Sequence, residues 1–146
     1  MDDRFRLTDV LLANMKRDRD RLVKLLEQVN NHWGYEDGLY RFYHQSFKVY
    51  HLQELTQQIV VALHSIAPED KPFSPFFEQL LREGTGQTFS QEANADWVRR
   101  TAPLVQAFLH ARYFLEMAVQ YADELDAAPQ LLPSGFAALL CLYDIR

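Results

Sequence analysis

The segment from residue 40 to residue 66 constrains the fold most, because it contains no proline or glycine and changes character halfway. Its first half, YRFYHQSFKVYH, carries five aromatic residues and two histidines, and its second half is mostly aliphatic. Such a run predicts one long helix from Glu36 or Asp37 to Ala67, where Pro68 ends it. Six side chains of that helix would share one sector of its surface: Tyr40, His44, Phe47, His51, Glu54 and Gln58. The sector is either a lined site or a packing seam with an exposed edge.

The length and composition indicate a single folded domain over residues 1–146. Hydrophobic residues make up 48% of the chain, so it can bury a sizeable core. The formal net charge of −5 argues against a dedicated nucleic-acid binder, which needs a basic face. No apolar run approaches the ~20 residues that cross a bilayer, so no membrane partner is predicted either.

The single cysteine, Cys141, excludes an intrachain disulfide framework and fits a reducing compartment. It lies in the apolar string FAALLCLY, where we expect a buried and unreactive thiol. The first residues, MDDRFRLTDV, are charged and lack the apolar core of a signal peptide. We therefore expect a cytoplasmic protein.

The N-terminal part of the chain, residues 1–31, predicts an amphipathic helix that begins after Thr8 as N-cap and ends near Asn30. Its apolar stripe consists of Leu11, Leu12, Met15, Leu22, Leu26 and Val29. The stripe thins at Asp18 and Arg19, and a helix of ~22 residues would be about 33 Å long, close to the width of the whole domain. The hypothesis that follows is a homo-oligomer in which part of this helix packs against a second subunit.

Shorter elements are predicted in the middle of the chain. Residues 76–83 predict a short helix that Gly84 closes. Ser90 is expected to cap a further helix that runs to Arg100. Pro103 then either kinks that helix or lies in the first turn of the next one.

The segment 104–125 has the cleanest amphipathic pattern of the chain, and its alanines would let another helix approach closely. Its predicted core face consists of Leu104, Ala107, Phe108, Ala111, Leu115, Ala118, Ala122 and Leu125. A final short helix over 136–143, capped by Ser134, is apolar nearly all round and should fill the core. The predicted fold is thus a single all-α domain of five to six helices, in which segments 40–66 and 104–125 pack on each other.

A metal site is the sharpest chemical hypothesis for the histidines. His51 and Glu54 are three residues apart and could bind one ion from one helical face, with His110 as a partner from another helix. Carboxylate-bridged sites in helix bundles use Glu-x-x-His pairs, and this chain has none. Hydrogen-bonded histidines in a packing seam are the preferred interpretation, and neither a metal nor another cofactor is predicted.

An apolar pocket with polar tips is a second hypothesis for the same region, although aromatics at helical spacing more often form core. Its lining would include Tyr40, Tyr43, Phe47 and Tyr50. In this hypothesis the pocket lies between the two long helices. Its ligand-binding residues are Tyr40, His44, His51, Glu54 and His110.

Other motifs have simple structural interpretations. The string GTGQT lacks both the lysine and the preceding strand of a phosphate-binding loop, so its glycines predict a helix end and a turn. Arg112 and Glu116 have the spacing of an ion pair on one helix. No pairing of a nucleophile with a base is apparent, so no catalytic residue is predicted.

Three strings, YRFYHQSFKVYHLQ, HARYFLEMA and LPSGFAALLCLY, resemble strings in short bacterial proteins of unassigned function. The resemblance covers residues 40–146 and leaves the N-terminal helix outside. It implies no activity, cofactor or site.

Two classes of function fit these observations. The first, which we favour, is a non-catalytic interaction or self-assembly module whose helical surfaces bind an unknown protein partner or another copy of the chain. The alternative is a small-molecule or metal-binding helical protein that uses the histidine, tyrosine and glutamate residues named above.

Overall fold

The computed structural model describes residues 3–34, 37–44, 47–86, 95–124 and 136–145. These residues form seven α-helices and one 3-10 helix, and no strand occurs among them. The elements are α1 (Asp3–Arg17), α2 (Arg19–Trp33), α3 (Gly38–Tyr43), α4 (Val49–Ser65), η1 (Pro68–Asp70), α5 (Pro75–Thr85), α6 (Ala95–Glu124) and α7 (Ala137–Leu142). The predicted all-α fold is confirmed, with five helices of seven or more residues and two shorter ones. None of these described helices combines the length and the apolar composition needed to cross a bilayer.

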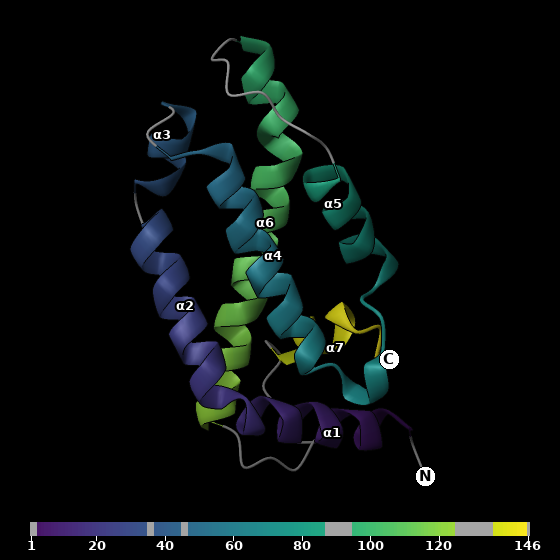
Figure 1. Cartoon of the computed structure of the whole chain (residues 1–146). Coiled ribbons are helices and arrows are strands. Elements are labelled where there is room, and N and C mark those ends of the chain that lie inside the picture. The colour runs from purple at the N-terminus through teal and green to yellow at the C-terminus, as the bar shows by residue number, and fades with distance from the viewer. Residues whose placement is uncertain (1–2, 35–36, 45–46, 87–94, 125–135, 146) are drawn as a thin grey trace.

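The long helix α6 is the axis of the fold, because α2, α4, α5 and α7 all pack on it (Figure 1). Its predicted core face is buried, and the described residues of that face are Leu104, Ala107, Phe108, Ala111, Leu115, Ala118 and Ala122. The expected packing of the aliphatic half of segment 40–66 on this face is confirmed by the contact of α4 with α6. The predicted ion pair is also present, with 3.5 Å from Arg112 Nε to Glu116 Oε1. Three further residues of the predicted elements, Ser90, Leu125 and Ser134, lie outside the described residues.

Gly84 lies inside α5, and the helix ends two residues later than expected, at Thr85, with Gly86 as its C-cap. A Cβ atom on Gly84 would lie 2.7 Å from the Pro103 carbonyl oxygen and 2.8 Å from Ala107 Cβ. The residue is therefore a glycine because α5 approaches the backbone of α6 closely at this point. Pro103 does not begin a new helix, since α6 is continuous through it.

The N-terminal segment forms two helices, so the prediction of one continuous helix is wrong. The chain turns at Asp18, whose carboxylate accepts hydrogen bonds from the Arg17 guanidinium at 3.0 Å and from the Ser65 hydroxyl at 3.2 Å. Thr8 is not a cap, because it lies inside α1, where its hydroxyl donates to the Arg4 carbonyl at 2.6 Å. The thinning of the apolar stripe around Asp18 marks this corner in the sequence.

Helix α1 crosses the lower end of the molecule in Figure 1 and covers the last carbonyl groups of α4 and of the residues that follow it. The Asn14 amide donates to the carbonyls of Ile66 and Ala67 at 3.2 and 3.3 Å. The Arg17 guanidinium donates to the Ser65 carbonyl at 3.0 Å. Carbonyls at a helix end have no partner within the helix, so these donors satisfy them, and the charge of Arg17 suits the negative end of α4.

The segment 40–66 is also divided, into α3 and α4, so the prediction of one helix from residue 36 or 37 to residue 67 is wrong. Phe42 and Phe47 both pack on Trp33, with ring centroids 6.2 and 5.3 Å apart. On one continuous helix these two phenylalanines would point about 140° apart and could not both face one indole. The break brings both rings onto Trp33, and all three side chains are buried.

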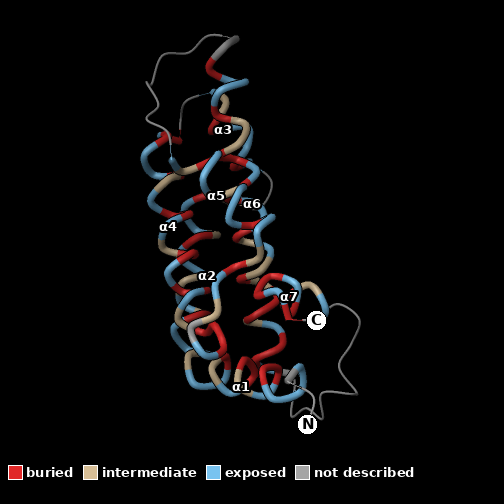
Figure 2. Tube along the Cα trace, turned by 90° about the vertical axis from the view of Figure 1, so that its right-hand side faces the viewer, coloured by how far each residue is buried: buried red, intermediate tan, exposed pale blue. Residues whose placement is uncertain are grey.

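The C-terminal segment fills the core, as predicted, and its buried residues are Phe136, Leu139, Leu140, Leu142, Tyr143 and Ile145. The Tyr143 hydroxyl donates to the Leu63 carbonyl at 2.5 Å, and burial raises the pKa of that hydroxyl. Cys141, predicted to be buried, is exposed, because it lies on the side of α7 opposite to Leu139. Figure 2 shows the general pattern, in which buried positions face the inside of the helix assembly and exposed positions face outward.

Deletion of residues 136–146 should abolish cooperative thermal unfolding, because it removes buried apolar side chains and leaves their neighbours uncovered. Circular dichroism during heating measures the transition. The single change Tyr143→Phe removes only the buried hydroxyl and should lower the free energy of unfolding by about 1–2 kcal/mol. A truncated chain with a sharp melting transition would contradict the placement of α7.

Because of the corner at Asp18, the free energy of unfolding should depend on pH in the acidic range. The Arg17 guanidinium, and then the Ser65 hydroxyl, hold the pKa of the Asp18 carboxyl below its usual range. The ionised carboxylate therefore stabilises the fold fully above about pH 4, and its contribution is lost as the pH falls through the lowered pKa. Asp18→Asn should lower the free energy of unfolding near neutral pH, and the difference from the native chain should shrink in acid.

Urea unfolding of both chains at several pH values measures this difference. Asp20→Asn is the matched control, because that side chain is 87% exposed. Its effect should stay within about 0.5 kcal/mol throughout. An Asp18→Asn effect that is equally large in acid would refute this role for the carboxylate.

Candidate functional site

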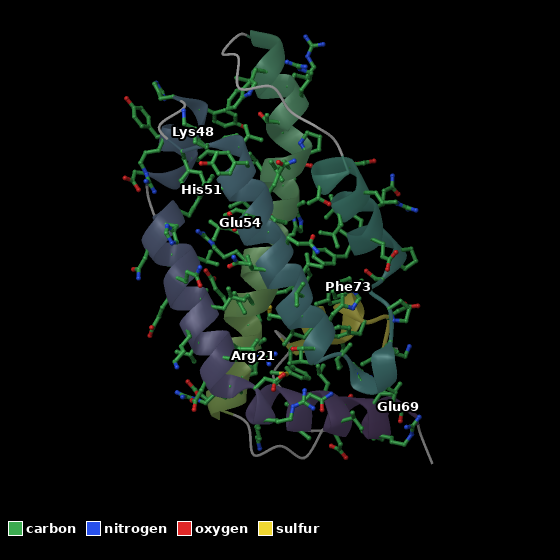
Figure 3. The ribbon with its side chains drawn as sticks, viewed as in Figure 1. Arg21, Lys48, His51, Glu54, Glu69 and Phe73 are labelled. Carbon is green, nitrogen blue, oxygen red and sulfur yellow. The ribbon has the colours of Figure 1, made fainter. Side chains whose placement is uncertain are left out.

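A groove runs between α2 and α4, which lie side by side and antiparallel. Asp18, before α2, contacts Ser65 at the end of α4, and His32 near the end of α2 lies beside His51 near the start of α4. Both helices also pack on α6, so their buried side chains face the core. The side chains that line the groove are those on their outer surfaces, and Figure 3 shows His51, Glu54 and Arg21 in order along it.

The upper end of the groove in Figure 3 is a small cavity of about 160 Å³. It is lined by Gln28, His32, Phe47, His51, Glu54, Leu55 and Gln58. The ring centroids of His32 and His51 lie 6.5 Å apart, and those of Phe47 and His51 lie 5.9 Å apart in a T-shaped arrangement. At the lower limit of this cavity, the Gln28 side-chain amide donates a hydrogen bond to the Gln58 amide oxygen at 3.5 Å, so this pair bridges the two helices.

The lower part of the groove is wider, with a volume of about 650 Å³. It is lined by Arg21, Lys24, Leu25, Gln28, Glu54, Gln57, Gln58, Val61 and Ala62. Its apolar surface is accessible, because Val61 is 57% exposed and Leu25 is half-buried. Gln28, Glu54 and Gln58 line both parts, which makes them one continuous surface.

In the lower part of the groove, the basic and the acidic side chains lie on different helices. Arg21 and Lys24 belong to α2, and Glu54 belongs to α4. All three side chains are exposed at the edges of the groove, above the apolar surface. A groove of this kind, with an apolar middle and charged edges, can bind an amphipathic partner.

The structure distributes the five predicted site residues over three places. His51 and Glu54 line the groove between α2 and α4. Tyr40 and His44 lie at α3, where their rings stack at 4.0 Å and His44 Nδ1 lies 2.9 Å from the Tyr40 carbonyl oxygen. His110 lies on α6 and lines a different depression, between α6 and α7, together with Tyr113, Phe114 and Cys141. The groove that holds His51 therefore lies between α2 and α4, whereas the predicted pocket was placed between the two long helices.

No arrangement of the described side chains supports the metal hypothesis. Among the residues that the structure describes, no group of three or more histidine, cysteine, aspartate or glutamate side chains is placed to hold a metal ion. His51 and His110, the two histidines that the hypothesis joined, line separate depressions.

Sequence reasoning missed the wall that α2 contributes. Its residues Arg21, Leu25, Gln28 and His32 follow one another at intervals of four, three and four, which places them on one helical face. This periodicity beside the buried stripe was the available signal. It could not be assigned to a groove without knowing that the chain turns at Asp18 and lays α2 along α4.

Comparison of the chain with protein families, with curated proteins and with solved structures finds no match. Its function must therefore be inferred from the geometry of the groove.

The groove should be dispensable for folding. Val61→Ala should change the free energy of unfolding by less than about 0.5 kcal/mol, because the side chain is exposed. Ile59→Ala, on the buried side of the same helix, should lower it by about 2–5 kcal/mol. Chemical denaturation of both variants gives these values. A large loss at Val61 would show that the side chain is packed and that the groove is closed in solution.

Proposed function

We propose that the protein is a non-catalytic interaction module that binds a polypeptide along the groove between α2 and α4. The observation that carries this proposal is the exposed apolar surface around Val61, which is 57% exposed in the widest part of the groove. Exposure of apolar surface beside charged edges is typical of a binding surface. We propose a cytoplasmic location for this activity, because the single Cys141 fits a reducing compartment.

The length of the groove suits a helical partner. Arg21 and His32 mark its two ends on α2, and eleven residues of helix extend over about 16 Å. That length accommodates roughly three turns of a helix, enough for several apolar anchors at intervals of three and four residues. The side chains of the partner would contact Val61 and Leu25, and its polar edges would face Arg21, Lys24 and Glu54.

The alternative of a small-molecule site has less support from the geometry. The cavity beside His51 and Glu54 holds about 160 Å³, whereas pockets for small organic ligands have volumes of about 300–1,000 Å³. The wider lower part, at about 650 Å³, lies within that range of volumes, but it is open along two helices and therefore suits an elongated partner such as a helix.

A photo-crosslinking amino acid at position 61 tests the proposal in the cells from which the protein comes. After irradiation, covalent adducts with a polypeptide should form from position 61, and mass spectrometry identifies the attached chain. The matched control is position 98, because Val98 is also an exposed valine, at 43%, but lies on α6 outside the groove. Equal yields of adducts from both positions, or none from position 61, would overturn the proposal.

A further inference from the structure

Two of the three charged residues that line the lower part of the groove, Lys24 and Glu54, are placed symmetrically about the Gln28–Gln58 pair. Lys24 precedes Gln28 by four residues on α2, and Glu54 precedes Gln58 by four residues on α4. Because the two helices run in opposite directions, Lys24 and Glu54 lie on opposite sides of the bridge, each about 6 Å along its helix axis from it. They also lie on opposite walls, so the line that joins them crosses the groove diagonally through the bridge.

A surface with this symmetry can pair with a copy of itself. In a twofold dimer the same surface is used twice, and each position meets the position to which the axis carries it. The axis considered lies in the plane of contact, passes through the Gln28–Gln58 pair and is perpendicular to the diagonal. A half-turn about this axis exchanges the places of Lys24 and Glu54. Lys24 of each copy then faces Glu54 of the other, and the contact contains two pairs of opposite charge.

The apolar surface is consistent with the same axis. Val61 follows Gln58 by three residues on α4, so it lies on the same wall of the groove as Glu54. Along the groove, however, it lies on the other side of the Gln28–Gln58 bridge from Glu54, which is the side of Lys24. It is therefore away from the charged diagonal and close to the axis itself. Positions near a twofold axis meet their own counterparts, so the exposed valines of the two copies would cover each other.

We infer that the occupant of the groove is a second copy of this chain, crossing it with reciprocal Lys24–Glu54 pairs about a twofold axis at Gln28 and Gln58. The inference rests on the proposed function and names the partner, whose helices cross the groove instead of lying along it. Charge complementarity carries it, because the groove holds both signs in positions that a twofold axis exchanges. It also gives a structural basis to the expected subunit interface on the N-terminal segment, of which α2 is the second half.

Charge exchange tests the inference with pure protein. Sedimentation across micromolar concentrations should show a dimer for the native chain. Lys24→Glu and Glu54→Lys each place two pairs of like charges in the contact, so each variant alone should lose at least about tenfold in dimer affinity. A mixture of the two variants should recover the dimer, because every acidic position then faces a basic one. The double variant carrying both changes should recover it as well.

The matched control is Glu27→Lys, which makes the same charge change at an exposed position of α2 outside the groove and should leave the dimer affinity unchanged. Circular dichroism establishes that each variant keeps its helices. A native chain that stays monomeric, single variants that dimerise as well as the native chain, or a mixture that does not recover would each overturn the inference. If the native chain is monomeric while position 61 crosslinks to a different polypeptide, the second copy is excluded and the groove keeps its proposed function.

Discussion

The small side chains along one face of α6 determine where the other helices lie. Ala107, Ala111 and Ala118 are fully buried there, and they let neighbouring backbones approach closely. The glycine of α5 meets the same region, at Pro103 and Ala107. Larger residues at these positions would push α4 and α5 outward and separate the side chains that fill the core.

The aromatic cluster at the end of α2 depends on this arrangement. Trp33 packs on Phe108 of α6 at 4.8 Å between centroids and also receives Phe42 and Phe47. Holding both phenylalanines on one indole requires the chain to leave the helical path between α3 and α4. The groove begins beside this cluster, since Phe47 belongs to both.

The parts of the fold that were predictable from the sequence are those with local causes. The apolar face of α6 is visible as a periodic pattern, and the buried C-terminal segment as an apolar run without a polar side. The two helix breaks have causes far apart in the sequence. Asp18 is held by Ser65, and Phe47 packs on Trp33. The thinning of the apolar stripe marks the position of the first break, but no local propensity predicts how the chain turns at either one. The same limitation applies to the site, where His51 and Glu54 were recognisable as a pair on one helical face but the opposite wall was not.

The groove is fixed at both of its ends by interactions that belong to the fold. At one end the corner at Asp18 is held to Ser65, and the donors of α1 are held to the last carbonyls of α4. At the other end Trp33 of α2 and Phe47 beside α4 are locked in the aromatic cluster. The spacing of the two walls is consequently established during folding and does not depend on a bound partner. Preorganisation of this kind reduces the conformational entropy lost on association, so modest contact area can still give a specific complex.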